Sequence, residues 1–359
     1  MGEPAQKRLV RKLDLELFLS KIKPHPSPEV NLEQYTISES VAATMLYLAA
    51  YTYGDIVGKK VLILGYGNQG RAQALTLRVS GAKVQIHLPS QSHSSKQAKK
   101  DGFHLQNLKN AVPDADYISF LTPDQWMPEI FEEVKSYLRP GQAVVFAHAL
   151  ALHFNLIKIP SGIDTLLVAP LGPGKKLWEL YQKGQGMTAW VAASPQKGFK
   201  KALAYAWGIG ATRPGAIQTT FRDEAIGDLF GEQAFLCGGL LGILLYSYQT
   251  MRRRGLSDAT ARLETLGQID SLAELLKTEG PAGFIQKISP TAAFGTEKAI
   301  KRLKVLAPVF EQLFFEIDSG RFVKEWMHAK RKFSRNNLIK KLGLKKLFGE
   351  NPQRLKAGF

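Results

Sequence analysis

The spacing of the hydrophobic residues changes about halfway along the chain. Up to about residue 193, apolar and β-branched residues gather in short runs separated by segments of helical character. Short runs of this kind are typical of buried strands, and the segments between them predict helices. The expected strands are 61–64, 83–88, 117–121, 143–147 and 165–168, with a last run at 188–193, and the helices between them include 71–79, 94–100 and 128–138.

This alternation of strands and helices predicts an α/β fold with a doubly wound parallel sheet, whose ligands bind at the carboxyl ends of the strands. After residue 193 the apolar residues recur at helical spacing instead, over 199–207, 220–245, 257–278 and 298–318. That period predicts an all-helical second half. We therefore expect four segments: a helical leader at 1–58, a nucleotide-binding domain at 59–190, a helical domain at 191–329 and a basic tail at 330–359.

Composition is that of a globular cytoplasmic protein. The 359 residues are 45% hydrophobic and 22% charged, and no uninterrupted apolar run approaches the roughly 20 residues of a membrane span. The N-terminus lacks the apolar core of a secretory signal. Cys237 is the single cysteine, which excludes an internal disulfide and suits a reducing compartment. We expect no membrane partner and a cytoplasmic location.

The net charge of +17 is concentrated at the C-terminal end, where residues 330–359 hold ten Lys or Arg against the single acid Glu350. A basic tail can bind RNA or an acidic surface. Such runs are more often solvated arms. RNA contact through the tail is therefore an open alternative that we do not expect.

A glycine turn follows the first expected strand, with the spacing Gly65-x-Gly67-x-x-Gly70. In a Rossmann-type unit the first glycine makes the turn, the second lets a pyrophosphate approach the backbone, and the third lets helix and strand pack closely. The N-terminus of the following helix attracts phosphate. The alternative is an ordinary strand-turn-helix connection, but the flanking elements favour dinucleotide binding.

In a Rossmann-type unit, the residue that binds the adenosine ribose and sets the preference between NADPH and NADH lies about twenty residues after that turn. The segment 87–96 holds no Asp or Glu for a ribose 2′-hydroxyl, but it holds Ser90, Ser92, Ser94 and Lys96, which suit a 2′-phosphate. This composition favours NADPH over NADH. A polar loop without a role is the alternative.

One carboxylate pair, and a second pair with the same spacing, stand out in the helical half. Asp228 and Glu232 are four residues apart, and Glu264 and Gln268 repeat that spacing. Residues four apart share a helix face, and like charges placed there repel unless a cation offsets the repulsion. Oxygen ligands of this kind suit Mg²⁺. Taken alone, such pairs are usually solvated faces.

A resemblance raises the weight of these residues. Over about 58–330 the chain is similar to ketol-acid reductoisomerase of the short-chain class, in the order and spacing of several motifs. These are the glycine turn, Phe146-Ala147-His148, Val168-Ala169-Pro170-Leu171-Gly172-Pro173-Gly174, Asp228-Leu229-Phe230-Gly231-Glu232-Gln233 and Ile288-Ser289-Pro290-Thr291. The resemblance implies an NADPH-binding domain, a knotted helical domain that forms a homodimer, and a magnesium-dependent alkyl shift followed by hydride reduction. That reaction converts acetohydroxy acids to dihydroxy acids in branched-chain amino-acid biosynthesis.

The resemblance also implies site residues. His148 and Ser289 fall on active-site positions. Asp228, Glu232, Glu264 and Gln268 fall on metal-ligand positions. The cofactor positions are Gly65, Tyr66, Gly67, Asn68, Gln69, Gly70, Ser90, Ser92, Ser94, Pro123 and Gly174.

Four positions depart from the family pattern. Leu171 stands where a lysine is expected, Gln268 where a second glutamate is expected, Ala149 replaces a glycine and Ile226 replaces a glutamate. The alkyl shift builds charge between two cations, so the loss of a lysine and of an anionic ligand weakens it. Hydride transfer needs fewer charged groups: a bound cofactor, one polarising cation and an orienting hydrogen-bond donor. We hypothesise a keto-acid reductase whose isomerase step is impaired or lost.

Residues 1–60 resemble a different family, the N-terminal segment of adenine-N6 RNA methyltransferases of the Asn-Pro-Pro-Phe type. No Asn-Pro-Pro-Phe occurs in the chain, and the loop at Gly65 lacks the acid of that family. Two alternatives stay open beside the reductase: an NADPH-binding dimer that acts as an interaction protein, and an RNA-associated protein of the methyltransferase type.

Overall fold

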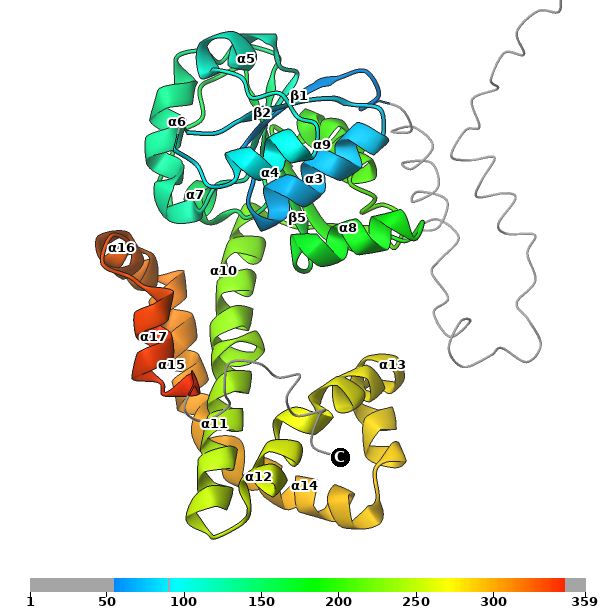
Figure 1. Cartoon of the computed structure of the whole chain (residues 1–359), viewed down its shortest axis with the longest axis vertical. Coiled ribbons are helices and arrows are strands. Elements are labelled where there is room, and N and C mark those ends of the chain that lie inside the picture. The colour runs from blue at the N-terminus through cyan, green and yellow to red at the C-terminus, as the bar shows by residue number, and fades with distance from the viewer. Residues whose placement is uncertain (1–54, 90, 346–359) are drawn as a thin grey trace, which may run out of the picture. The chain divides into compact units, whose positions relative to one another are not determined.

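The computed structural model describes residues 55–89 and 91–345 (Figure 1). Ser90, residues 1–54 of the expected leader with its methyltransferase resemblance, and the tail beyond residue 345 lie outside the described residues. The chain divides into two compact units after Ala225. Each unit is described by itself.

The first unit is built on a seven-stranded sheet in the order β2-β1-β3-β4-β5-β6-β7. Its strands are β1 (Lys60–Leu64), β2 (Lys83–His87), β3 (Tyr117–Phe120), β4 (Ala143–Phe146), β5 (Asp164–Pro170), β6 (Ala189–Ser194) and β7 (Ala216–Gln218). Neighbouring strands are parallel except β5 and β6, which are antiparallel. The chain leaves β1 toward β2 on one side and returns to β3 on the other, so the order reverses at β1. This confirms the predicted doubly wound α/β sheet.

Helices cover both faces of this sheet because successive strand residues point to opposite faces. Val61 and Ile63 pack in one apolar cluster with residues of α3 (Asn68–Val79) and α9 (Phe199–Gly208). Leu62 and Leu64 pack in a second cluster with residues of α5 (Leu108–Asp114) and α6 (Met127–Lys135). From residue 55 onward, where the structure describes this unit, it also contains α4 (Ser95–Lys100), α7 (Leu150–His153) and α8 (Gly174–Gln182), with short 3₁₀ turns η1 (Asp124–Trp126) and η2 (Gln196–Gly198). α3 and α8 lie side by side (Figure 1).

The end of the sheet unit differs from the expected boundary at residue 190. That position falls inside β6, and the sheet continues through β7. α9, which the sequence pattern assigned to the helical half, contributes Tyr205 and Ala206 to the buried core of the sheet. A helical period shows that a segment is helical but not which element it packs against, and this is the physical reason for the difference.

The second unit is helical, as predicted. It begins within α10 (Phe221–Gly231) and continues through η3 (Glu232–Leu236), which is a π-helical turn, and α11 (Gly238–Arg253). The later elements are α12 (Asp258–Leu263), η4 (Leu266–Gln268), α13 (Ile269–Lys287), α14 (Pro290–Leu303), η5 (Lys304–Leu306), α15 (Ala307–Asp318), α16 (Arg321–Ala329) and α17 (Arg335–Lys341). The three long helices expected at 220–245, 257–278 and 298–318 are each interrupted by one of these short turns.

Large apolar side chains of the second unit are exposed on several helices. They include Leu240, Leu241, Ile243 and Tyr246 on α11 and Phe310, Phe314 and Phe315 on α15. Among the described residues, the helical run Phe221–Arg253 is long and apolar enough to cross a membrane by length and composition alone. That finding is weak because an apolar surface that another chain buries meets the same criterion, and the π-helical turn interrupts the run.

Candidate functional site

The candidate site lies at the edge where the parallel strands of the first unit end. Gly65 follows β1, Thr122 follows β3, His148 follows β4 and Leu171 follows β5. The strands run in register, so their carboxyl ends meet at the same edge. This is where the ligands of doubly wound sheets bind.

Close packing requires a glycine at two of the three glycine positions of the turn. Gly65 has a φ of +99°, and a Cβ there would lie 2.5 Å from the carbonyl oxygen of Leu121. A Cβ on Gly70 would lie 2.5 Å from the carbonyl oxygen of Gly65. A side chain on Gly65 would press against the residues that follow β3, and one on Gly70 would push α3 away from the turn after β1. The second contact is the close packing of helix and strand that the turn motif predicts.

Gly67 is different, because no contact with the described residues requires a glycine there. Its φ is −79°, and a Cβ would have no described atom within 4 Å. The open space lies at the N-terminus of α3, where no described side chain caps the helix. Unpaired N–H groups beside open space suit a phosphate. The arrangement therefore fits the pyrophosphate of a dinucleotide.

The neighbouring loop residues hold two site loops together. Gln69 donates from Nε2 to the carbonyl oxygen of Gly172 at 2.9 Å, and Asn68 accepts at Oδ1 from the backbone N–H of Lys175 at 3.1 Å. A Cβ on Gly174 would lie 2.1 Å from the carbonyl oxygen of Asn68. Asn68, Gln69 and Gly174, all predicted at the cofactor, thus fasten the glycine turn to the loop after β5.

Tyr66 anchors the turn through its buried ring and its hydroxyl. Its ring is buried, and its hydroxyl donates to Oδ2 of Asp101 at 2.9 Å. Asp101 also accepts from Nε of Arg71 at 2.7 Å and from Nε2 of Gln97 at 2.9 Å. The hydrogen bond from Arg71 holds the pKa of Asp101 below its ordinary value, and burial raises the pKa of Tyr66. Asp101 is therefore an ionised clamp between the turn and α4.

A cavity of about 590 Å³ opens beside Gly65, of a size that holds an adenosine group. Its described lining is Leu64, Gly65, His87, Leu88, Pro89, Leu105, Gln106, Asn107, Leu108, Thr122, Ile130 and Glu133. The hydroxyl of Thr122 is buried and has no hydrogen-bond partner among the described residues, so it is an unsatisfied group that a ligand can bond.

Three other residues predicted at the cofactor stand apart from this lining. Ser92 accepts at its hydroxyl from the backbone N–H of Ser94 at 3.3 Å, in the loop after β2. Pro123 precedes η1, one residue after Thr122. None of the three is among the described lining residues of the cavity.

His148 is held by a carboxylate that sequence reasoning did not single out. Nδ1 of His148 lies 3.2 Å from Oε1 of Glu224, and the backbone N–H of Ala149 donates to Oε2 of Glu224 at 2.7 Å. Glu224 is only 4% exposed. The available signal was the place of Glu224 between the charged pair Arg222-Asp223 and the apolar pair Ala225-Ile226, where a carboxylate that turns toward the core needs partners.

The residues predicted to bind metal are not gathered within a single chain. Asp228 and Glu232 are exposed and lie at the change from α10 to the π-helical turn. Glu264 accepts from Nε2 of Gln268 at 3.0 Å. Across residues 55–89 and 91–345, no group of three or more His, Cys, Asp or Glu residues is placed to hold a metal ion. The described chain alone does not fit a magnesium centre.

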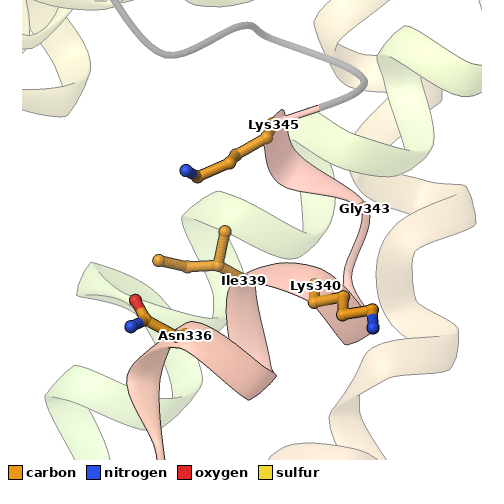
Figure 2. A pocket seen from close by; sticks show the side chains of 5 residues that line it. All are labelled: Asn336, Ile339, Lys340, Gly343 and Lys345. Atoms are coloured by element: carbon orange, nitrogen blue, oxygen red, sulfur yellow. The ribbon is translucent and has the colours of Figure 1, made fainter.

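Ser289, the second predicted catalytic residue, caps a helix. Its hydroxyl oxygen accepts from the backbone N–H of Ala292 at 3.1 Å, at the start of α14. Figure 2 shows another cavity, of about 450 Å³, at the C-terminal end of the described chain. Its described lining is Asn336, Ile339, Lys340, Gly343 and Lys345, none of which is a predicted site residue.

Family models match both halves of the chain. Residues 55–215 match the acetohydroxy acid isomeroreductase NADPH-binding domain, and residues 221–346 match the ketol-acid reductoisomerase C-terminal domain. The junction between the two matches lies close to the division of the structure after Ala225.

Curated relatives and solved structures agree with these matches. The ketol-acid reductoisomerase (NAD(P)(+)) of Metallosphaera sedula is 38% identical over 289 residues, which are 77% of this chain and 84% of the relative. The NADP(+) enzyme of Helicobacter pylori is 38% identical over 283 residues, 77% of this chain and 86% of the relative. A solved NADH-preferring ketol-acid reductoisomerase from an uncultured archaeon has a TM-score of 0.74 at 28% identity, covering 83% of this chain and 93% of that one.

With both domains of the family matched along the chain and relatives of this similarity, the chain belongs to the ketol-acid reductoisomerase family.

Proposed function

We propose that this protein reduces an acetohydroxy-acid-like 2-keto acid with NADPH, and that its alkyl-shift step is weakened. The observation that carries cofactor binding is the open space at Gly67, at the start of α3. The turn that holds Gly67 is fixed by the hydrogen bonds of Tyr66 and Gln69. The curated relatives include both NADP(+) and NAD(P)(+) enzymes. The preference for NADPH over NADH rests on the absence of an acid in segment 87–96.

The residues of the chain have distinct tasks in this proposal. The backbone around Gly67 binds the pyrophosphate, and the cavity beside Gly65 takes the adenosine end. Bound NADPH supplies the hydride. Glu224 fixes the ring of His148, which sits at the carboxyl end of β4, so that the imidazole can hold a proton beside the substrate oxygen.

Two departures from the family pattern support the weakened alkyl shift. Leu171 is 50% exposed at the site edge and provides no charge where the resemblance implies a lysine. Gln268 is neutral and donates to Glu264, so it offers one fewer anionic ligand. Stabilising developing charge is the largest catalytic contribution to such a step, so both losses act against it.

Magnesium binding is a separate part of the proposal. Asp228, Glu232 and Glu264 are its candidate ligands, on the strength of the family resemblance. Calorimetric titration of the protein with Mg²⁺, repeated with Asp228→Asn, tests it. We expect the heat of binding to fall in the variant, and equal heats would remove Asp228 from the ligand set.

We also propose that the second unit associates with another copy of the chain. The exposed apolar side chains of α11 and α15 support this, because a surface of that kind is seldom left in water. Light scattering should give the mass of a homodimer, whereas a monomer of 39.8 kDa would refute the assignment. We also propose a cytoplasmic location, which the biosynthetic family supports and which cell fractionation tests.

Binding is the first experiment. Titration of the full chain with NADPH, followed by cofactor fluorescence, should show saturable binding that is tighter than that of NADH. Tighter binding of NADH would overturn the preference. Binding without oxidation of NADPH by any keto acid would favour the alternative of an NADPH-binding interaction protein.

A further inference from the structure

A line of four side-chain hydrogen bonds crosses the core of the first unit. The hydroxyl of Ser119 donates to the hydroxyl of Tyr205 at 2.9 Å, and that hydroxyl donates to Oε1 of Gln73 at 2.8 Å. Nε2 of Gln73 donates to Oε1 of Gln69 at 3.2 Å. Nε2 of Gln69 donates to the carbonyl oxygen of Gly172 at 2.9 Å. The line joins β3, α9 and α3 to the loop after β5.

Every bond in this line has the same direction. Each donor points toward Gly172, so each amide has one orientation only: Gln73 must present its oxygen to Tyr205 and its nitrogen to Gln69. Hydrogen bonds in series polarise one another and strengthen the whole line. The arrangement is therefore more specific than four separate contacts.

The inner members are fully buried. Ser119, Gln73 and Tyr205 each have 0% of their surface exposed, and burial raises the pKa of the Tyr205 hydroxyl, which keeps it protonated as a donor. Burying polar groups adds little stability over apolar groups of the same shape. Phe and Met would fill the positions of Tyr205 and Gln73, so stability alone does not account for the polar side chains.

The line ends where the site begins. Gln69 lies within the glycine turn, between Gly67, which borders open space, and Gly70, which is closely packed. Gly172 follows Leu171, one of the four positions that depart from the family pattern. The last bond therefore sets the spacing between the two loops that face the cofactor.

We propose that Tyr205 and Gln73 are positioning residues for NADPH binding. Through Gln69 they hold the glycine turn and the loop at Leu171–Gly172 at the separation that the bound dinucleotide requires. Holding both loops before the ligand arrives lowers the ordering cost of binding. This inference rests on the proposed function, because it assumes that NADPH binds at the glycine turn.

The test compares two tyrosines. Tyr205→Phe removes the hydroxyl inside the line. Tyr181→Phe is the matched control, because the Tyr181 hydroxyl lies 2.6 Å from the hydroxyl of Ser80, just after the far end of α3. We expect Tyr205→Phe to weaken NADPH binding by about three- to tenfold, the effect of one lost hydrogen bond. Tyr181→Phe should stay within about twofold of the unchanged protein.

Gln73→Met gives a second break in the line and carries the test if Tyr205→Phe does not fold. The double variant, Tyr205→Phe with Gln73→Met, should bind NADPH no more weakly than Gln73→Met alone. Both substitutions interrupt the same line of hydrogen bonds, so their effects on binding should not add. Melting temperatures of all variants are measured beside the dissociation constants. A structural role would weaken binding only in proportion to lost stability, and it would act equally in Tyr181→Phe.

The outcomes separate the two claims. In one outcome the unchanged protein binds NADPH with a dissociation constant that Tyr205→Phe and Gln73→Met each change by less than twofold. That result leaves the proposed function standing and overturns the positioning role. Equal weakening in Tyr205→Phe and Tyr181→Phe also overturns it. Failure of the unchanged protein to bind NADPH refutes the proposed function together with this inference.

Discussion

Oε1 of the Glu224 carboxylate lies 3.2 Å from Nδ1 of His148, while its other oxygen accepts from the backbone N–H of Ala149. Both oxygens of one buried acid thus hold two successive residues of the loop after β4. A histidine fixed in this way keeps one ring orientation, which a proton donor or acceptor needs. The relationship makes Glu224 part of the site although the sequence did not mark it.

Replacement of Glu224 by Gln should lower kcat about tenfold and leave the dissociation constant of NADPH unchanged. The two partners face different oxygens of the carboxylate, and the amide carries an oxygen on one side only, so it cannot accept from both in this arrangement and His148 loses its fixed orientation. Steady-state kinetics with a keto acid measure this. Asp223→Asn, at the exposed neighbouring residue, is the control and should change neither constant. An unchanged kcat in Glu224→Gln would exclude the positioning of His148.

The three glycines of the turn should respond differently to alanine. Gly67→Ala meets open space at a negative φ, so we expect a loss of at most about 1 kcal/mol of stability, as for a helix N-cap. NADPH binding should nevertheless weaken by about tenfold or more, because the methyl group occupies the phosphate space.

Gly70→Ala should instead destabilise the fold by about 1–3 kcal/mol, since its Cβ would meet the carbonyl oxygen of Gly65. Urea unfolding and NADPH titration of both variants separate the two effects. Tight binding by Gly67→Ala would show that the phosphates lie elsewhere.

The Asp101 clamp predicts a dependence of stability on pH. Its pKa in the folded protein is lowered, so its contribution is present above the unfolded value of about 4 and is lost as pH falls through the folded value. Asp101→Asn should cost about 1–2 kcal/mol at neutral pH, because Arg71 is half exposed and partly screened. The difference in melting temperature between the two proteins should shrink below about pH 4. A difference that stays constant down to pH 3 would contradict an ionised clamp.

Two of the four altered family positions, Gln268 and Leu171, can be reversed by substitution. Gln268→Glu places a second carboxylate four residues from Glu264, which costs about 0.2–0.5 kcal/mol unless a cation binds between them. We expect Mg²⁺ to raise the melting temperature of this variant more than that of the unchanged protein. Equal shifts would count against a metal at Glu264.

Combining Gln268→Glu with Leu171→Lys should raise turnover of 2-acetolactate by about tenfold or more. Leu171 is exposed, so the lysine does not disturb the core. No gain in the double variant would show that other departures, such as Ile226, limit the alkyl shift.

Local sequence pattern sufficed for the sheet and for the glycine turn. Short apolar runs predicted β1 to β5 because buried parallel strands need them, and the glycine spacing predicted the close packing at Gly65 and Gly70. The helical second half also followed from periodicity, although the π-helical turn at Glu232 did not, since nothing in a 3.6-residue period marks an extra residue in one turn.

Contacts between residues far apart in the sequence could not be predicted from the local sequence pattern. The pairing of His148 with Glu224 spans 76 positions, and the contact between Gln69 and Gly172 spans 103. Asn68 and Gln69 were predicted at the cofactor because they lie in its motif, and the motif did not reveal that their side chains bond to the segment after β5. The assignment of α9 to the sheet depended in the same way on what its apolar face touches.

The most direct test of the proposed function compares two substrates. NADPH oxidation by the full chain is followed by absorbance in the presence of Mg²⁺, once with 2-acetolactate and once with the already rearranged 3-hydroxy-2-keto acid. We expect the rearranged acid to be reduced at least about tenfold faster, because it needs the hydride but not the alkyl shift. Reduction of 2-acetolactate at an equal or higher rate would contradict the weakened isomerase step.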